Sequence, residues 1–201
     1  METREKILEI AMDQFARLGV RYVTVDDIAR AAGVSKKTIY QEFKDKAQLV
    51  LEAFKNKMQE DQAFFMNLYD ENKGAIWHFV EVSKYIRSRY SNINPVVFSE
   101  IQRYYPSCWK LFEDFRQNCA IKTISDVLKK GKKEGTFRSE IDADILALVR
   151  MDQIASTFDS EKFPPSKFNV LEVQMAIMDH FIHGILTDKG RELFYTINNQ
   201  D

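Results

Sequence analysis

Polar and cationic side chains recur between residues 35 and 46 at positions from which they could hydrogen-bond to nucleic acid. Ile39 and Phe43 lie four residues apart, a spacing that anchors one face of a helix. With that face buried, the outward side chains would be Lys37, Thr38 and Gln41, flanked by Lys36 and Tyr40. Lysine and glutamine can read guanine and adenine edges, and a threonine methyl can contact thymine. The pattern predicts a helix that enters the major groove of DNA; the alternative is a helical hairpin with an ordinary polar outer face.

Local signals upstream predict the elements that would hold this helix. Thr24, with Asp27 three residues later, is typical of a capping box at the start of a helix. Gly33 would end that helix and supply the open backbone of a tight turn. Ser35 would cap the next helix and leave backbone N–H groups near a phosphate. An amphipathic helix that ends at Gly19 precedes them, which makes a helix-turn-helix unit of three helices.

Composition favours an all-α protein. The 201 residues are 45% hydrophobic and 29% charged, and only 7 glycines and 4 prolines occur, fewer than an all-β fold would need for its turns. The formal net charge is −1, but residues 28–46 carry five cations and two acids. Local positive charge of this kind is typical of a module that contacts phosphates. The N-terminus is amphipathic with acidic residues, and no apolar run reaches the ~20 residues of a membrane span, so we expect a cytoplasmic protein without a membrane segment.

The chain lacks the usual residue sets of catalysis. No Ser/His/Asp set, thiol pair or phosphate-binding loop occurs, so we expect no catalytic residues and no cofactor. His180 and His183 beside Asp179 could form a metal pair, but such spacing also arises at interfaces, and we expect no metal site. If Cys108 and Cys119 share one helix they lie roughly 16 Å apart along its axis, too far for a disulfide. We interpret both as reduced thiols.

The rest of the chain has helical periodicity interrupted by turn signals. Asp45 would cap a fourth helix, and helices are expected at about 48–69, 75–90, 95–105, 107–130, 144–158 and 167–187.

The N-terminal motif resembles the DNA-binding region of the TetR family of transcriptional regulators. The shared pattern comprises Phe15, Gly19, Thr24, Ile28-Ala29, Ala32-Gly33-Val34-Ser35, Ile39-Tyr40, Phe43 and Lys46. Val20 and Lys37 depart from it. The resemblance implies an all-helical homodimer, with residues 1–46 as the DNA-binding domain and residues 47–201 as a larger domain for ligand binding and dimerisation. It also implies that Tyr40, Lys46 and Thr24 contact phosphates and that Lys36, Lys37, Thr38 and Gln41 lie in the groove. Glu42, at the edge of the face, would accept from cytosine or stay away from the DNA.

Aromatic and apolar residues supply the remaining site predictions. A pocket for an apolar or aromatic effector would be lined by Phe65, Tyr69, Trp77, Tyr85, Tyr104, Trp109 and Phe112. The last predicted helix is apolar on more than one stripe, which favours a dimer interface at Ile177, Phe181, Ile182 and Ile185. The alternative is a helix buried centrally in a monomer.

The sequence thus predicts a homodimeric transcriptional regulator that binds a near-palindromic operator in double-stranded DNA and is released, as a repressor, by a small molecule. Two alternatives stay open: a constitutive DNA-binding factor without effector control, and a helical enzyme or carrier.

Overall fold

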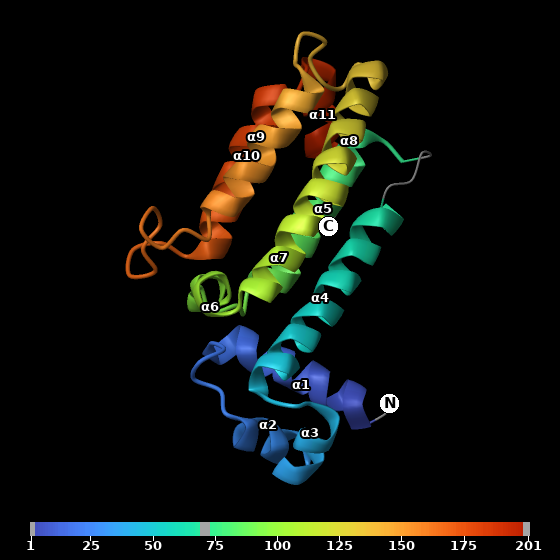
Figure 1. Ribbon diagram of the computed structural model, residues 1–201. Helices are drawn as coiled ribbons and strands as arrows, with labels where there is room; N and C mark the ends of the chain where they lie inside the picture. Colours follow the sequence, from blue (N-terminus) through green and yellow to red (C-terminus); the bar gives the residue numbers. More distant parts are fainter. Residues whose placement is uncertain (1–2, 69–72, 199–201) are drawn as a thin grey trace. The chain divides into compact units, whose positions relative to one another are not determined.

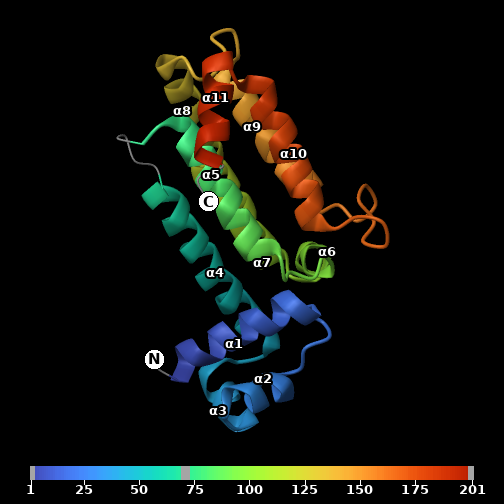
Figure 2. The same ribbon diagram turned by 180° about the vertical axis from the view of Figure 1, so that it is seen from behind.

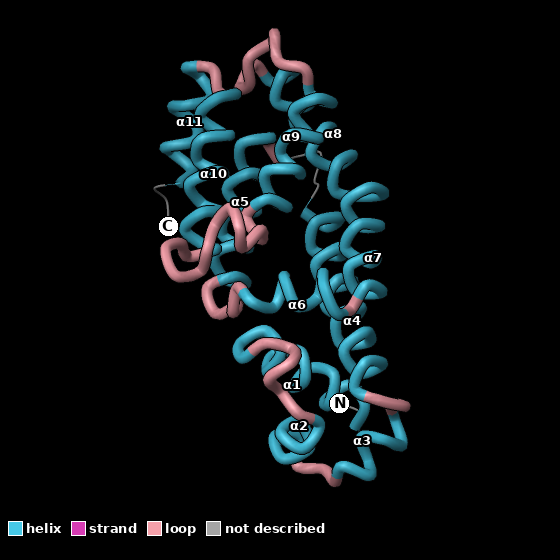
Figure 3. Tube along the Cα trace, turned by 60° about the vertical axis from the view of Figure 1, so that its left-hand side comes forward, coloured by secondary structure: helices cyan, strands magenta, loops and turns pink. Residues whose placement is uncertain are grey.

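A computed structural model describes residues 3–68 and 73–198 of the chain. Within these ranges the backbone is helical apart from turns, loops and one isolated antiparallel bridge between Phe137 and Leu186 (Figures 1 and 3). The chain forms two compact units, each built from two separate segments. Unit 1 comprises Met1–Asp61 and Asn92–Glu113, and unit 2 comprises Gln62–Ser91 and Asp114–Asp201.

Unit 1 contains the predicted helix-turn-helix and the helices that support it. In chain order these are α1 (Thr3–Leu18), α2 (Val25–Ala32), α3 (Lys36–Glu42), the first part of α4 (Lys46–Leu68), α6 (Val96–Tyr104) and most of α7 (Pro106–Phe115). Their shared core includes Phe15 from α1, Ile39 from α3 and Leu49 from α4, and also Ile101 from α6. The core of this unit therefore continues past Lys46 into α4 and α6.

Unit 2 is a bundle around a second core. It contains the end of α4, α5 (Ala75–Tyr90), the π-helical turn η1 (Arg116–Ala120), α8 (Ile121–Glu134), α9 (Ala143–Ser156), α10 (Val170–Ile185) and α11 (Asp188–Asn198). Helix α5 packs against α8, α10 and α11 (Figure 2). Backbone hydrogen bonds from Arg138 to Ile185 and from Thr187 to Thr136 fix the segment after α8 against the junction of α10 and α11.

The local signals correspond to the observed helix ends. Asp45 accepts from the Gln48 backbone N–H at 2.8 Å at the start of α4, and Gly19 follows α1 with φ +94°. The segment predicted as one helix over 107–130 is interrupted by the π turn η1, and α11 was not predicted. Cys108 and Cys119 are both free, and burial raises the pKa of the Cys108 thiol to about 11. No helix in the described ranges is both long and apolar enough to cross a bilayer.

Candidate nucleic-acid interface

The turn between α2 and α3 is built by the residues that the sequence singled out. The Thr24 hydroxyl accepts from the Asp27 N–H at 3.2 Å while the Asp27 carboxylate accepts from the Thr24 N–H at 3.0 Å, so the predicted capping box is present. These bonds hold the pKa of the Asp27 carboxyl below its usual value. Gly33 ends α2 with φ +68°, a conformation that side chains rarely adopt. Ser35 caps α3 by accepting from the Thr38 N–H at 3.0 Å.

One face of helix α3 is buried in the core of unit 1, and the opposite face is exposed. Ile39 and Phe43 are each 1% exposed, which confirms the anchoring face. Lys37, Tyr40 and Gln41 are exposed and make no hydrogen bond or ion pair within the described chain. Three side chains that can donate to bases or phosphates are therefore available on one helix whose orientation the core determines.

The flanking predicted residues are more constrained. Thr38 is half-buried, and its hydroxyl lies 2.9 Å from that of Ser35. The Lys36 ammonium lies 2.8 Å from the Asp26 carboxylate of α2, and this bond raises the pKa of Lys36. Both partners are about half exposed, so the pair contributes little to stability and can exchange for a phosphate.

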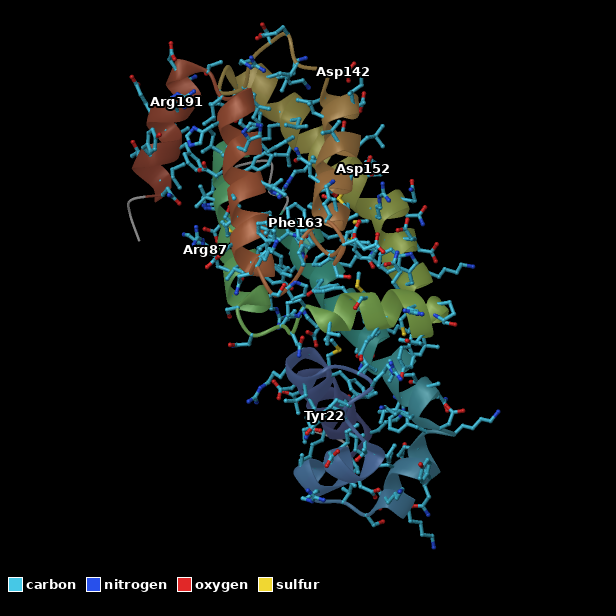
Figure 4. The ribbon with its side chains drawn as sticks, turned by 90° about the vertical axis from the view of Figure 1, so that its left-hand side faces the viewer. Tyr22, Arg87, Asp142, Asp152, Phe163 and Arg191 are labelled. Carbon is cyan, nitrogen blue, oxygen red and sulfur yellow. The ribbon has the colours of Figure 1, made fainter. Side chains whose placement is uncertain are left out.

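Lys46, for which the family resemblance implies a phosphate contact, bonds to the protein itself. Its ammonium donates to the Val20 carbonyl at 2.6 Å and approaches the Arg21 carbonyl at 3.5 Å. Partial burial lowers the pKa of this ammonium. Lys46 therefore holds the linker between α1 and α2, on which Tyr22 is labelled in Figure 4.

Two groups of long-range contacts, one around Arg4 and one around Glu100, position this unit and were not predicted. Arg4 of α1 pairs with Glu52 of α4, lies 3.8 Å from the Glu42 carboxylate at the end of α3, and stacks over the Phe43 ring. The pair with Arg4 keeps Glu42 occupied within the protein. From α6, the Glu100 carboxylate accepts from the Arg21 N–H at 3.0 Å. Partners 38 to 79 residues apart leave no spacing signal, so the sequence offered no means of finding them.

The predicted effector residues fall into separate groups. In unit 1, Trp109 and Phe112 pack together with ring centroids 5.2 Å apart. Tyr104, on α6, is 46% exposed and stacks on the Arg21 guanidinium. These three side chains belong to the core and surface of the DNA-binding unit.

In unit 2, Phe65 and Tyr85 belong to an aromatic cluster with Phe64 and Phe115, in which Phe64 and Tyr85 stack at 3.7 Å. Trp77 lies apart from this cluster, beneath the Lys73 ammonium. Tyr69 falls outside the described residues. The seven predicted residues therefore do not line one pocket in the described chain. A cavity of about 180 Å³ lies instead between α5, α10 and α11.

The predicted dimer residues are largely internal. Phe181, Ile182 and Ile185 are between 2% and 6% exposed and belong to the core of unit 2, so they are not available to a partner. Ile177 is half-buried. The alternative of a centrally buried helix accounts for these three side chains, because α10 packs against both α5 and α9. The His183 nitrogens are also occupied, with Nδ1 2.8 Å from Arg191 and Nε2 3.5 Å from Asp179.

A capped α2, a glycine turn and an α3 anchored by buried Ile39 and Phe43, with exposed polar side chains, form a helix-turn-helix of the kind found in DNA-binding proteins. Residues 7–53 match the family described as "Bacterial regulatory proteins, tetR family". Residues 7–53 therefore carry a DNA-binding domain of this family, and the proteins that the chain resembles are transcriptional regulators.

Individual relatives agree with this assignment. The HTH-type transcriptional repressor KstR2 of Mycobacterium tuberculosis is 26% identical over 146 residues, which is 71% of this chain and 73% of that protein. The HTH-type transcriptional regulator AcrR of Shigella flexneri is 45% identical over 51 residues, covering 25% of this chain and 24% of AcrR. The fold is similar to that of a protein from Saccharomonospora viridis described as a "putative transcriptional regulator" and solved in complex with choline, with a TM-score of 0.71, 24% identity, and 92% of this chain and 97% of that chain covered.

Proposed function

We propose that this protein is a homodimeric repressor whose operator binding is relieved by a small molecule. The observation that carries the proposal is the free face of α3, where Lys37, Tyr40 and Gln41 are exposed and unbonded on a helix fixed by the core. Similarity to the repressor KstR2 supports repression rather than activation. The absence of a membrane-spanning helix in the described ranges is compatible with action in the cytoplasm.

The residues of the helix-turn-helix would fall into two groups, those that contact base edges and those that contact phosphates. Lys37 and Gln41 would donate to base edges, with the Thr38 methyl beside them. Phosphates would be contacted by Ser35, Lys36, Tyr40, Thr24 and Lys46. Because Lys46 already donates to the Val20 carbonyl, its contribution would combine a phosphate contact with support of the linker after α1.

Dimerisation would use an apolar stripe on α9. Ile145, Leu148 and Val149 are 58%, 50% and 42% exposed, and their spacing places them on one helix face. Apolar side chains grouped in this way indicate a protein contact. A two-fold dimer would present its two recognition helices to half-sites about 34–36 Å apart, or somewhat more.

DNA binding is tested by capturing genomic fragments with the purified protein and measuring affinity for the recovered site. Gln41→Ala or Lys37→Ala should weaken operator binding by ~1–3 kcal/mol and random DNA by less. Lys55→Ala removes a charge from an exposed position of α4 and serves as the control. Equal losses on operator and random DNA for Gln41→Ala would exclude that side chain as a reader.

The dimer is tested by Leu148→Glu, with Leu193→Glu, on α11 and 37% exposed, as the control. Light scattering should show a monomer for the first variant only, with weaker operator binding. If both variants remain dimeric, the dimer interface lies elsewhere.

Effector control is tested by reciprocity. A compound that lowers operator affinity must itself bind more weakly to the DNA complex by the same factor, usually about 5- to 150-fold. A bound compound that is indifferent to DNA would favour a constitutive factor. Turnover without DNA affinity would favour the enzyme or carrier, a class to which none of the three relatives described above belongs.

A further inference from the structure

Unit 2 buries an arginine that has no acidic partner among the residues that the structure describes. Arg150 of α9 is 2% exposed. Its Nη2 donates to the Met178 thioether at 3.2 Å, a weak acceptor, and its guanidinium lies 5.6 Å from the centre of the Phe181 ring. The Nη1 atom is buried and has no hydrogen-bond partner in the described chain. Figure 4 labels Asp152, two residues further along the same helix.

Among the described residues, no carboxylate is paired with this charge. The buried polar residues of the described chain are His78, Ser125, Thr136, Arg150, Thr157 and Gln174, none of which is acidic. Asp152 pairs with Arg116, and Asp179 of α10 lies beside His183. Burial lowers the pKa of Arg150 only to about 10, so the side chain remains charged at neutral pH. A buried cation that lacks a partner is unfavourable, and an anion supplied from outside the chain would relieve the cost.

A second unbonded group lies nearby on α10. Gln174 is 2% exposed, and its Nε2 donates to the Thr157 hydroxyl at 2.6 Å, while that hydroxyl donates to the Ile154 carbonyl. This chain of bonds fixes the orientation of the amide and leaves Oε1 buried without a donor. Gln174 precedes Met178 by four residues, which is about 6 Å along α10. The unbonded Oε1 therefore belongs to a residue about one turn from Met178, the residue that Arg150 contacts.

We propose that Arg150 binds the carboxylate of a monoanionic, largely apolar ligand, and that this ligand is the effector. The inference rests on the proposed function and names the chemical class of its ligand. A single guanidinium balances a single negative charge, which favours a carboxylate over a doubly charged phosphate. Gln174 Oε1 would accept from a hydroxyl or amide N–H of the same ligand.

Arg150 and Gln174 do not line the cavity between α5, α10 and α11, but Met178 links Arg150 to it, and the apolar part of the ligand would lie there. Met178, which accepts from Arg150, also lines the cavity of about 180 Å³. Phe79, Val80 and Ile182 contribute apolar walls, and Arg87 and Lys84 lie among the lining residues. Methionine is unbranched and adapts its shape readily, so a short alkyl chain can be accommodated against it.

The test uses the full-length protein with straight-chain carboxylates from acetate to decanoate and the matching neutral amides. The carboxylates should raise the unfolding midpoint of the wild type and bind at least about 10-fold more tightly than to Arg150→Met, as expected for a charge-assisted hydrogen bond. The amides should not distinguish the two proteins. Arg150→Lys should restore part of the affinity, and Arg150→Met without ligand should unfold at the same denaturant concentration as the wild type or a higher one.

Arg87→Met removes a second cation, which lines the same cavity, and tests whether the acid binds there instead. It should reduce carboxylate affinity less than Arg150→Met does; loss in this variant alone would place the acid at Arg87 and overturn the proposal. Arg103→Met, at an exposed position of α6 in unit 1, is the control and should leave carboxylate binding unchanged. The proposal is also overturned if no carboxylate distinguishes wild type from Arg150→Met, or if that variant is strongly destabilised. Carboxylate binding through Arg150 without any change in operator affinity would retain the site and reject the effector role. Operator release by a neutral compound, equal in wild type and Arg150→Met, would retain the proposed function and reject the carboxylate.

Discussion

Helix α6 is part of the core of the DNA-binding unit, and Ile101→Ala tests this directly. Ile101 is 4% exposed and packs in the cluster that contains the buried residues of α1, α2 and α3. The helix is also tied to the linker after α1, since the Asn94 N–H donates to the Ala16 carbonyl at 2.7 Å and Glu100 accepts from the Arg21 N–H. A DNA-binding domain that ended at Lys46 would be insensitive to a substitution at position 101.

The magnitude follows from the burial. Truncating a buried isoleucine to alanine removes its transfer free energy and leaves a cavity, at a cost of about 2–5 kcal/mol. This is a large part of the ~5–15 kcal/mol that stabilises a typical domain. Ile101→Val should cost only about 0.5–1.5 kcal/mol. Val96→Ala on the same helix should cost less than Ile101→Ala, because Val96 is 39% exposed.

The assay is urea unfolding followed by circular dichroism, together with operator affinity measured against urea concentration. Ile101→Ala should bind DNA normally without denaturant and lose binding at a lower urea concentration than Val96→Ala. If DNA binding by Ile101→Ala and by the wild type failed at the same urea concentration, α6 would contribute nothing to the unit and the argument would be refuted.

Three further predictions concern unit 2 and the helix cap. Burial lowers the pKa of His78 to about 4 from 6.5, so the folded protein binds this proton only at a lower pH than the unfolded chain does. The free energy of unfolding should therefore fall by about 3 kcal/mol as the pH drops from 6.5 to 4. His78→Gln should flatten this pH dependence, which urea titrations at each pH would measure. In Gly190→Ala the new Cβ would lie 2.0 Å from the Thr136 carbonyl oxygen, so melting should show a loss of ~1–3 kcal/mol, whereas Gly184→Ala has no atom within 4 Å of its Cβ and should be neutral or stabilising. Thr24→Ala should cost ~1 kcal/mol by removing the cap of α2, and an unchanged melting temperature would show that the capping box is dispensable.

The helix-turn-helix could be predicted because its determinants are local. Thr24 and Ser35 each cap a helix through residues three positions later, and Gly33 is needed for a single left-handed backbone conformation. Such signals depend on a few neighbouring residues and survive in any fold that contains them. The outward face of α3 follows from them, because burial of Ile39 fixes the rotation of the helix.

Helix α11 was not predicted, because its own residues give only weak helical signals. It is short and mostly polar, and it contains Gly190, which reads as a breaker in sequence. In the structure that glycine is required because the Thr136 carbonyl lies against the helix at this point. The helix is stabilised by packing on α5, a contact between segments about a hundred residues apart.

Assignment of apolar faces failed where it depended on which neighbours cover them. The stripes of α10 suggested a partner chain, yet Phe181 and Ile182 are buried by helices of the same unit. Conversely, Leu148 and Val149 of α9 have the composition of a core stripe and are exposed. Hydrophobic periodicity establishes that a face must be covered, whereas topology decides whether the cover comes from the same chain.

The same reasoning applies to charged residues and changes the interpretation of Lys46. The family resemblance implies that Lys46 contacts a phosphate, yet its ammonium already bonds to the carbonyls of Val20 and Arg21. The Arg21 N–H is held in turn by Glu100, so the linker before α2 is fixed from α4 and from α6. Truncation of Lys46 would remove both the support of this linker and any contact with a phosphate. Random and operator DNA should then be affected alike, and stability should fall as well, which separates Lys46 from readers such as Gln41.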